Sequence, residues 1–265
     1  MRIARYSVDD VIHYGVVELE QDGTGNPDTV ADLTGDPFSG PVKLSGVRHE
    51  LSAVRLLAPV IPRSKVVGIA KNSVPGQNTP LESTSIPSFF LKPNTSVIGP
   101  GEAIQIPQLS TDTALEAEVA IVIGRICRCV PVERVPEVIF GYTCVNDVTA
   151  RDQFQDGIPW GVAKSWDTFT PIGPWIVTHL SVEEASSLTV LGRVNGEAVT
   201  TGTTRGLIHG IAELVSFVSS VMTLLPGDLI LTGAPGGAAP IHAREEVTID
   251  IEEIGQLTNP VIGEA

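Results

Sequence analysis

The sequence has no long apolar run. No stretch approaches the roughly 20 apolar residues that a membrane helix needs, and the opening residues MRIARYSVDD lack the apolar segment of a signal peptide. These absences predict a cytoplasmic protein without a membrane partner. Basic residues are also scarce, because 17 Lys and Arg stand against 31 Asp and Glu, for a formal net charge of −14. Such a chain repels polyanions, so we do not expect nucleic acid as a partner.

Cysteine and several catalytic motifs are also scarce or absent. Cys127, Cys129 and Cys144 are an odd number, and their spacing lacks the further Cys or His of a zinc site, so we interpret them as buried apolar thiols. Neither a G-x-x-x-x-G-K-[ST] loop nor a strand–GxGxxG–helix unit occurs, which disfavours ATP and NAD. No Ser or Cys stands in a nucleophile-elbow context, so a triad hydrolase has no visible framework.

What is present indicates a globular protein of 265 residues, with 42% hydrophobic and 18% charged residues. Short strands and turns, such as RIARY and YGVVELE, predict a small β-rich N-terminal domain over residues 1–58. From residue 59 to residue 265, apolar strands alternate with Gly/Pro loops, which predicts one main domain with a boundary near Pro59.

Two segments of the main domain have distinct patterns. Residues 72–87 are rich in Pro, Ser, Thr, Asn and Gly, so we expect a loop that is either a lid over a site or a plain surface loop. Apolar residues at helical spacing between Thr204 and Met222 predict a helix with Thr204 as its cap. His209 lies among the polar positions of that pattern and is interpreted as a solvated residue.

A pair of carboxylates carries the chemistry. ALEAEVAIVIG has the β-branched character of a strand, and the period of 2 places Glu116 and Glu118 on one face. Two neighbouring carboxylates on a largely buried strand are unfavourable unless a cation, a proton or solvent relieves them. A hard divalent ion such as Mg²⁺ takes oxygen ligands and keeps open positions for substrate. The alternative is an exposed strand face that needs no ion.

Two later segments add polar residues. GYTCVNDVTARD ends an apolar run with Asp147 and continues to Arg151, and WGVAKSWD brings Lys164 beside aromatic residues. A strand-end carboxylate suits a third metal ligand, and a lysine can stabilise a developing enolate. The alternative for each segment is an ordinary polar surface loop.

The chain resembles the fumarylacetoacetate hydrolase family over about residues 60–262. The resemblance rests on the ordered segments KVVGIAKN, FFLKPNTSVIGPGE, LEAEVAIVIG, GYTCVNDVTARD, AKSWDTFTPIGPWIV, NGE and LLPGDLILTG. It implies an α+β fold with a mixed β-sheet roll, a small β-rich N-terminal domain, and usually a homodimer. It also implies Mg²⁺, with Mn²⁺ or Ca²⁺ as alternatives, on Glu116, Glu118 and Asp147. By the same resemblance Lys164 is the active-site lysine, and Arg151 belongs to the polar stretch beside the substrate.

The chain departs from the family pattern on the substrate side. Family members usually carry Tyr and His, followed closely by Glu, in the lid, whereas residues 72–77 read NSVPGQ here and Glu82 is the first acid. Phe154 replaces a glutamine that typically contacts substrate, and Ala234, after Gly233, replaces a threonine. Loss of a general base typically lowers a rate by about 10²–10⁴-fold, so hydrolysis of the fumarylacetoacetate type is disfavoured. We expect Ser73, Phe154, Gly233 and Ala234 to shape an apolar substrate pocket.

Three hypotheses follow. The leading one is a divalent-metal-dependent enzyme that acts on a small-molecule oxo-acid or 1,3-dicarbonyl through a metal-stabilised enolate, by isomerisation, decarboxylation or C–C cleavage. Lys164 would stabilise the oxyanion and Arg151 would position the substrate. A second is a family scaffold recruited to specialised metabolism, such as cyclisation of a polyketide-like dicarbonyl. A third is a non-catalytic dimer that binds a metal or a small ligand.

Overall fold

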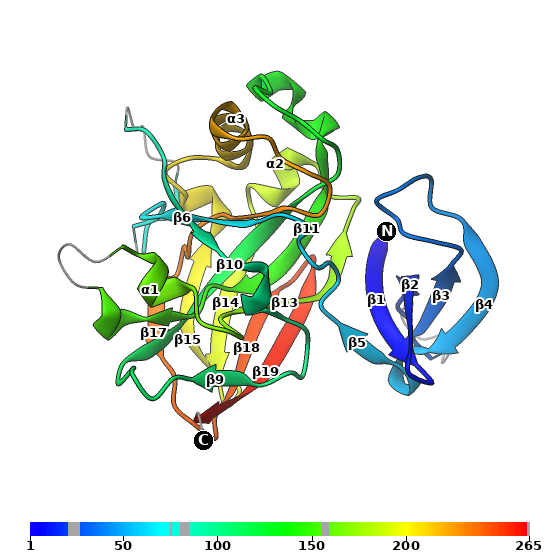
Figure 1. Cartoon of the computed structure of the whole chain (residues 1–265), viewed down its shortest axis with the longest axis horizontal. Helices are drawn as coiled ribbons and strands as arrows, with labels where there is room; N and C mark the ends of the chain where they lie inside the picture. The colour runs from blue at the N-terminus through cyan, green and yellow to red at the C-terminus, as the bar shows by residue number, and fades with distance from the viewer. Residues whose placement is uncertain (21–26, 75, 80–84, 155–158, 264–265) are drawn as a thin grey trace.

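The structure is a computed structural model of the chain, and it describes residues 1–20, 27–74, 76–79, 85–154 and 159–263. Glu82, considered above as a lid acid, lies outside the described residues. Two mixed β-sheets with a few short helices make up the fold, as Figure 1 shows. The predicted α+β class is therefore confirmed.

The larger sheet runs in the order β4-β3-β2-β1-β13-β11-β10-β16-β6-β7, with β5, β8, β12 and β17 paired to it from the side. Its strands are β1 (Arg2–Val8), β2 (Val11–Glu18), β3 (Thr29–Leu33), β4 (Leu44–Glu50), β5 (Arg55–Leu57), β6 (Val66–Ala70), β7 (Ser88–Lys92), β8 (Val97–Ile98), β10 (Thr113–Ile123), β11 (Ile139–Asn146), β12 (Thr149–Ala150), β13 (Thr170–Val177), β16 (Leu229–Leu231) and β17 (Ala238–Pro240).

The smaller sheet runs in the order β15-β14-β18-β19-β9. Its strands are β9 (Ile104–Ile106), β14 (Thr189–Val194), β15 (Glu197–Thr203), β18 (Glu246–Ile251) and β19 (Gly255–Gly263). The α-helices are α1 (Gly161–Lys164), α2 (Val182–Ala185) and α3 (Ile211–Val221), and the 3-10 turns are η1 (Leu51–Ala53), η2 (Asn94–Ser96), η3 (Val132–Glu137), η4 (Arg151–Gln153) and η5 (Thr204–Gly206). Within the described ranges, no helix has the length and apolar character needed to cross a membrane.

Strand β10 lies in the middle of the larger sheet, between β11 and β16. The apolar row that includes Val119 and Ile121 belongs to the main core, while Ala120 and Val122 on the other face pack into a second buried cluster with residues of β13 and β16. Both faces of the strand are therefore covered along most of its length. The alternative of an exposed strand face does not hold, because the Glu118 residue is only 1% exposed.

The N-terminal strands β1 to β4 form an antiparallel meander that extends one edge of the larger sheet. In Figure 1 they make a separate blue lobe beside the rest of the molecule. The join to the main sheet is short, since β1 pairs with β13 only through Arg2↔Val177 and Ile3↔Ile176. We therefore propose that the chain has two domains, residues 1–58 and residues 59–265.

The predicted helix beginning at Thr204 is wrong in its first two turns. Residues Thr204–Gly206 form η5, and α3 begins only at Ile211. The backbone N–H groups of Ile208 and His209 instead donate to the main-chain oxygen and side-chain oxygen of Asn72, at 2.8 and 2.7 Å. Because these N–H groups are used in a tertiary contact, the chain stays non-helical there.

The three cysteines are free thiols in different environments. Cys144 is fully buried, as predicted, whereas Cys127 is partly buried and Cys129 is exposed. The prediction of a buried thiol is wrong for Cys129, which lies exposed in the loop between β10 and η3.

Candidate metal centre

The register of β10 against β11 assembles three carboxylates. Ala117 is paired with Asn146 in this antiparallel ladder. The next residue along, Asp147, therefore lies opposite Glu116, and its N–H donates to the Glu116 main-chain oxygen at 2.9 Å. Glu116 and Glu118 share a face of β10 as the strand period predicts. Carboxylate oxygens of Glu116, Glu118 and Asp147 lie within 4.8 Å of one another.

Neighbouring groups hold each carboxylate in place. The Glu118 carboxylate accepts a hydrogen bond of 2.6 Å from the Gly233 N–H, in the turn after β16. Thr149 donates its hydroxyl to the Glu116 carboxylate at 3.0 Å, and the Asn146 side-chain oxygen accepts from the Glu116 N–H at 3.0 Å. These bonds come from two segments that are distant in the sequence, residues 146–149 and the turn after β16, so the orientation of Glu116 and Glu118 depends on the packed fold.

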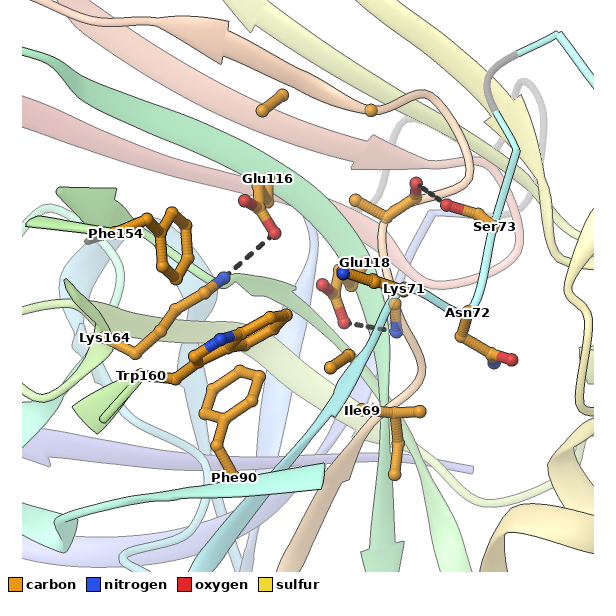
Figure 2. Close-up of a pocket in the computed structure, with 15 residues that line it drawn as sticks. Ile69, Lys71, Asn72, Ser73, Phe90, Glu116, Glu118, Phe154, Trp160 and Lys164 are labelled. Atoms are coloured by element: carbon orange, nitrogen blue, oxygen red, sulfur yellow. Dashed lines mark hydrogen bonds and ion pairs between the residues drawn. The ribbon is translucent and has the colours of Figure 1, made fainter. Parts of the chain in front are cut away.

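Two buried lysines each bind a different carboxylate oxygen of Asp147. Lys164, at the end of α1, donates to Asp147 at 2.6 Å and to Glu116 at 3.0 Å. Lys92, at the end of β7, forms an ion pair with the other Asp147 oxygen and donates to the Phe169 main-chain oxygen at 2.8 Å. Figure 2 shows the contact between Lys164 and Glu116. Both lysines are thus committed to the acidic cluster.

The ionisable groups of the cluster have pKa values that are shifted in different directions. Burial, together with the charges of Asp147 and Glu116, raises the pKa of Glu118 well above its ordinary value. Burial alone would raise the pKa of Asp147, but the ammonium groups of Lys164 and Lys92 outweigh it and lower that pKa. Burial would likewise lower the pKa of Lys164, and the surrounding carboxylates reverse this and raise it. Lys164 is therefore an ammonium ion across the physiological range.

This donor set fits a divalent cation. Three carboxylates with converging oxygens are hard ligands of the kind that Mg²⁺, Mn²⁺ and Ca²⁺ accept. Burial and the charges of Asp147 and Glu116 oppose the ionised form of Glu118 and raise its pKa, whereas a nearby positive charge would favour that form. Glu116, Glu118 and Asp147 are the residues that would hold the ion.

A cavity with a volume of about 250 Å³ opens onto this cluster. Glu116, Glu118 and Lys164 are the members of the cluster that line it. Its apolar wall is aromatic, because the Trp160 ring centroid lies 5.1 Å from that of Phe154 and 5.8 Å from that of Phe90. Figure 2 shows these rings beside Lys164. The volume suits a small molecule of few heavy atoms.

Four residues predicted to shape the substrate pocket line this cavity: Ser73, Phe154, Gly233 and Ala234. The Ser73 hydroxyl donates to the Ala234 main-chain oxygen at 2.5 Å, which joins the start of the loop predicted over residues 72–87 to the loop after β16. Arg151, predicted to position the substrate, is not among the described residues that line the cavity. Its guanidinium binds Asp112 at 2.5 Å instead.

Several residues of the site were missed in the sequence. They are Lys71, Asn72, Phe90, Lys92 and Trp160, which line the cavity or, for Lys92, hold Asp147. The sequence contains no signal for Lys92, because hydropathy predicts Leu91 to be buried and Lys92 to be exposed, whereas Lys92 is buried and Leu91 is 48% exposed. Lys71 has no signal either, because it follows the strand.

The interpretation of His209 as solvated is wrong. The residue is 5% exposed, and its ring contacts the Glu213 carboxylate at 2.8 Å. His209 is buried because α3 begins only at Ile211. His209 therefore lies before the helix, where its backbone binds Asn72, and not on the solvent face of the helix. His209 is not among the described residues that line the cavity.

Comparison with known proteins places two family models on the chain. The model of the fumarylacetoacetate (FAA) hydrolase C-terminal region matches residues 65–262, and the model of the Rv2993c-like N-terminal region matches residues 1–59. The protein Rv2993c of Mycobacterium tuberculosis is 42% identical, covering 99% of this chain and 98% of its own length. The mitochondrial oxaloacetate tautomerase FAHD2A of Homo sapiens is 33% identical, covering 94% of this chain and 84% of its own.

Two solved structures are also similar to this chain. The 2-hydroxyhepta-2,4-diene-1,7-dioate isomerase of Mycobacterium marinum superposes with a TM-score of 0.90 at 41% identity, covering 100% of this chain and 99% of its own. Maleylpyruvate hydrolase of Sphingobium sp. SYK-6, in complex with manganese(II) and pyruvate, superposes with a TM-score of 0.77 at 27% identity, covering 100% of both chains. The similarity extends over the whole chain in both cases.

Proposed function

This chain is an enzyme of the fumarylacetoacetate hydrolase family, and from that premise we propose that it uses a divalent metal ion to act on a small oxo-acid or 1,3-dicarbonyl compound through an enolate. Isomerisation and decarboxylation are the reactions we favour over hydrolytic C–C cleavage. The metal ligands in this proposal are Glu116, Glu118 and Asp147, and Mg²⁺ is the proposed ion, with Mn²⁺ as the experimental substitute.

The cluster of three carboxylates and one ammonium carries this proposal, because Glu116, Glu118 and Lys164 of this cluster line a small cavity. When bound, a divalent ion supplies Lewis acidity that stabilises negative charge on a substrate oxygen. Relatives named as an oxaloacetate tautomerase and as a hydrolase bound to manganese and pyruvate support an oxo-acid as the substrate class.

Lys164 has the properties of an oxyanion-stabilising residue. Its ammonium group lines the cavity and is 3% exposed, and its pKa is raised by the carboxylates around it. It therefore stays charged, and it would donate to an oxygen that becomes negative as an enolate forms in exchange for one of its three present acceptors. Fixed donors in a water-poor site are more effective than donors in water, because they need no reorganisation during the reaction.

The lid sequence favours a reaction that does not require an activated water. Residues 72–77 read NSVPGQ, without the Tyr and His of the usual family pattern. Phe90, Phe154 and Trp160, which form the aromatic wall of the cavity, offer no general base that could activate a water. Proton transfer next to a carbonyl, or loss of carbon dioxide, needs the enolate to be stabilised but needs no attacking water.

The test combines metal binding with a substrate panel. Calorimetry measures Mn²⁺ binding to the wild type, to Glu118→Gln, and to Glu197→Gln, whose carboxylate lies exposed on β15. Loss of an outer-sphere partner typically weakens metal binding by about 10–100-fold, so we expect at least that loss in Glu118→Gln and none in Glu197→Gln. Keto–enol exchange and decarboxylation of oxaloacetate, and cleavage of an acylpyruvate, are then followed with each variant. Full turnover by Glu118→Gln, or no turnover of any oxo-acid by the metal-loaded wild type, would overturn the proposal.

Two further features remain proposals of the same kind. We propose that the protein is a homodimer and that it acts in the cytoplasm. Sedimentation of the purified chain measures its oligomeric state, and a monomer across the micromolar range would refute the homodimer. Fractionation of cells that express the chain measures its location.

A further inference from the structure

A second cavity, with a volume of about 360 Å³, lies at the loop between β10 and η3. It shares no described lining residue with the cavity at the metal centre. About 17 Å of extended strand separate Glu118 from Ile123, the last residue of β10 before this loop. The cavity is therefore distinct from the carboxylate cluster, and the proposed function does not use it.

The charge of this cavity is opposite to that of the whole chain. Three arginines within residues 125–134 line it, namely Arg125, Arg128 and Arg134. Among the described residues that line it, Glu137 is the only acidic one. The chain as a whole has a formal net charge of −14, so this local excess of positive charge is not a general property of its surface. A concave site lined by charges of one sign concentrates ions of the other sign, so the cavity attracts anions.

Arg128 is fixed to the fold through one part of its guanidinium. Its Nη1 donates to the main-chain oxygens of Ser219 and Ser220, in the last turn of α3, at 3.0 and 2.5 Å. The loop is fixed to the same turn, because the Cys129 and Val130 N–H groups donate to the main-chain and side-chain oxygens of Ser219, each at 2.9 Å. Within the described chain, Nε and Nη2 of Arg128 have no acceptor. The helix therefore holds one side of this guanidinium, and the other side is available to a ligand.

The single carboxylate of the cavity is already neutralised by one of the arginines. Arg134 donates to Glu137 through Nε and Nη2, and the Nη2 contact measures 2.8 Å. This hydrogen bond lowers the pKa of Glu137, and the charges of Arg134 and Arg125 add to the effect. The Arg125 side chain has no ion pair or hydrogen bond to the part of the chain that the structure describes. The charges of Arg125 and Arg128 are thus uncompensated.

Part of the cavity wall is apolar. Ile126 follows Arg125 and is 70% exposed, and Val130, Pro131 and Val138 also line the cavity. An exposed isoleucine gains free energy when an apolar group covers it. The volume falls near the lower end of the range of ligand pockets, which is about 300–1,000 Å³. A fitting ligand therefore combines an anionic group with a small apolar part.

We propose that this cavity is a second ligand site and that it binds a small organic phosphate. The phosphate group contacts Arg125 and the available side of Arg128, and the apolar part of the ligand lies against Ile126. A guanidinium presents its N–H donors in a fixed fork that matches phosphate oxygens, and such charge-assisted bonds are stronger than neutral ones. A phosphate ester carries a charge of about −1.5 to −2 at pH 7, which matches two uncompensated arginines. The inference is independent of the metal centre.

Three probes separate the contributions of charge and apolar contact. Phenyl phosphate and phenyl sulfate have the same ring and a tetrahedral anionic group, but the phosphate carries more negative charge at pH 7. Inorganic phosphate lacks the ring. Calorimetry with the Mg²⁺-loaded protein gives the dissociation constant of each probe. We expect phenyl phosphate to bind about tenfold more tightly than either of the others, because each comparison removes one favourable contact.

The variants are Arg125→Gln, Ile126→Ser and the control Arg55→Gln, which removes the same charge from an exposed position on β5. All three side chains are exposed, so the variants should fold. Loss of a hydrogen bond to a charged group weakens binding by about tenfold or more, so Arg125→Gln should bind phenyl phosphate about tenfold more weakly. Ile126→Ser should weaken phenyl phosphate while its affinity for inorganic phosphate stays within about twofold. Arg55→Gln should leave every constant unchanged.

Three results would overturn the assignment. If the wild type and Arg125→Gln bind phenyl phosphate equally, the ligand lies elsewhere on the molecule. If phenyl sulfate binds as tightly as phenyl phosphate, the cavity does not select the doubly charged group. If the wild type binds none of the probes at millimolar concentration, the three arginines form a solvated surface and no ligand site. None of these results bears on metal binding by Glu116, Glu118 and Asp147.

Discussion

Replacing Glu118 by glutamine should make the metal-free protein more stable. The Glu118 carboxyl is buried beside Asp147 and Glu116, and one of its oxygens accepts a hydrogen bond from Gly233. Glutamine keeps the shape and this acceptor, and it removes the charge that burial and two like charges oppose. The same change removes a metal ligand, so the stabilising effect of a divalent ion should decrease. One substitution therefore has opposite effects in the two conditions.

The size of this difference in stability follows from the raised pKa of Glu118. In the unfolded chain this carboxyl loses its proton near its ordinary value of 4.5, whereas the folded metal-free protein retains the proton to a higher pH. The native state then binds more protons than the unfolded state. The free energy of unfolding therefore falls as pH rises from 4.5 toward the folded pKa, by up to about 1.4 kcal/mol for each pH unit. The lowered pKa of Asp147 acts in the opposite direction, but only below about its ordinary 3.8.

Urea unfolding in the presence of a chelator, at about pH 5, 6 and 7, measures this contribution. We expect the wild type and Glu197→Gln to lose stability over this range relative to Glu118→Gln. With saturating Mn²⁺ the order should invert, because the ion binds the ionised carboxylate and stabilises the native state by mass action. Parallel pH curves for wild type and Glu118→Gln without metal would refute the account of a proton-retaining Glu118. A wild type no more stabilised by Mn²⁺ than Glu118→Gln would refute its role as a ligand.

Two further substitutions test the architecture around the cluster. Gly233→Ala should lower the free energy of unfolding by about 2 kcal/mol or more in urea titrations, because φ is +95° there and a Cβ would lie 2.9 Å from the Asn72 Cβ; an unchanged midpoint would show that the turn can relax. Lys92→Met should lower the free energy of unfolding by about 3 kcal/mol, because a buried ammonium beside Asp147 is lost. The control Leu91→Gln, on the exposed side of β7, should change the free energy of unfolding by no more than about 0.5 kcal/mol. Equal effects at positions 91 and 92 would contradict the orientation of that strand.

Local patterns in the sequence predicted the elements that carry the candidate site. The apolar row of β10 and its period of 2 place Glu116 and Glu118 on one face wherever the strand lies, because side-chain alternation is a property of the extended backbone itself. The ordered segments that resemble the family extended this to Asp147 and Lys164. The α+β class was implied by the same resemblance, and it is confirmed.

Only the tertiary structure decided which residues meet. Asp147 reaches Glu116 through the register between two strands, and register depends on pairing rather than on either strand alone. Lys92 is buried and Leu91 is exposed, the reverse of their hydropathies, because β7 turns its charged residue toward a carboxylate that lies 55 positions away. Asn72 stopped the predicted helix before Ile211 by binding backbone groups far along the chain. Periodicity reports the surroundings of a residue within one element, whereas hydrogen bonds between distant segments depend on how the elements pack.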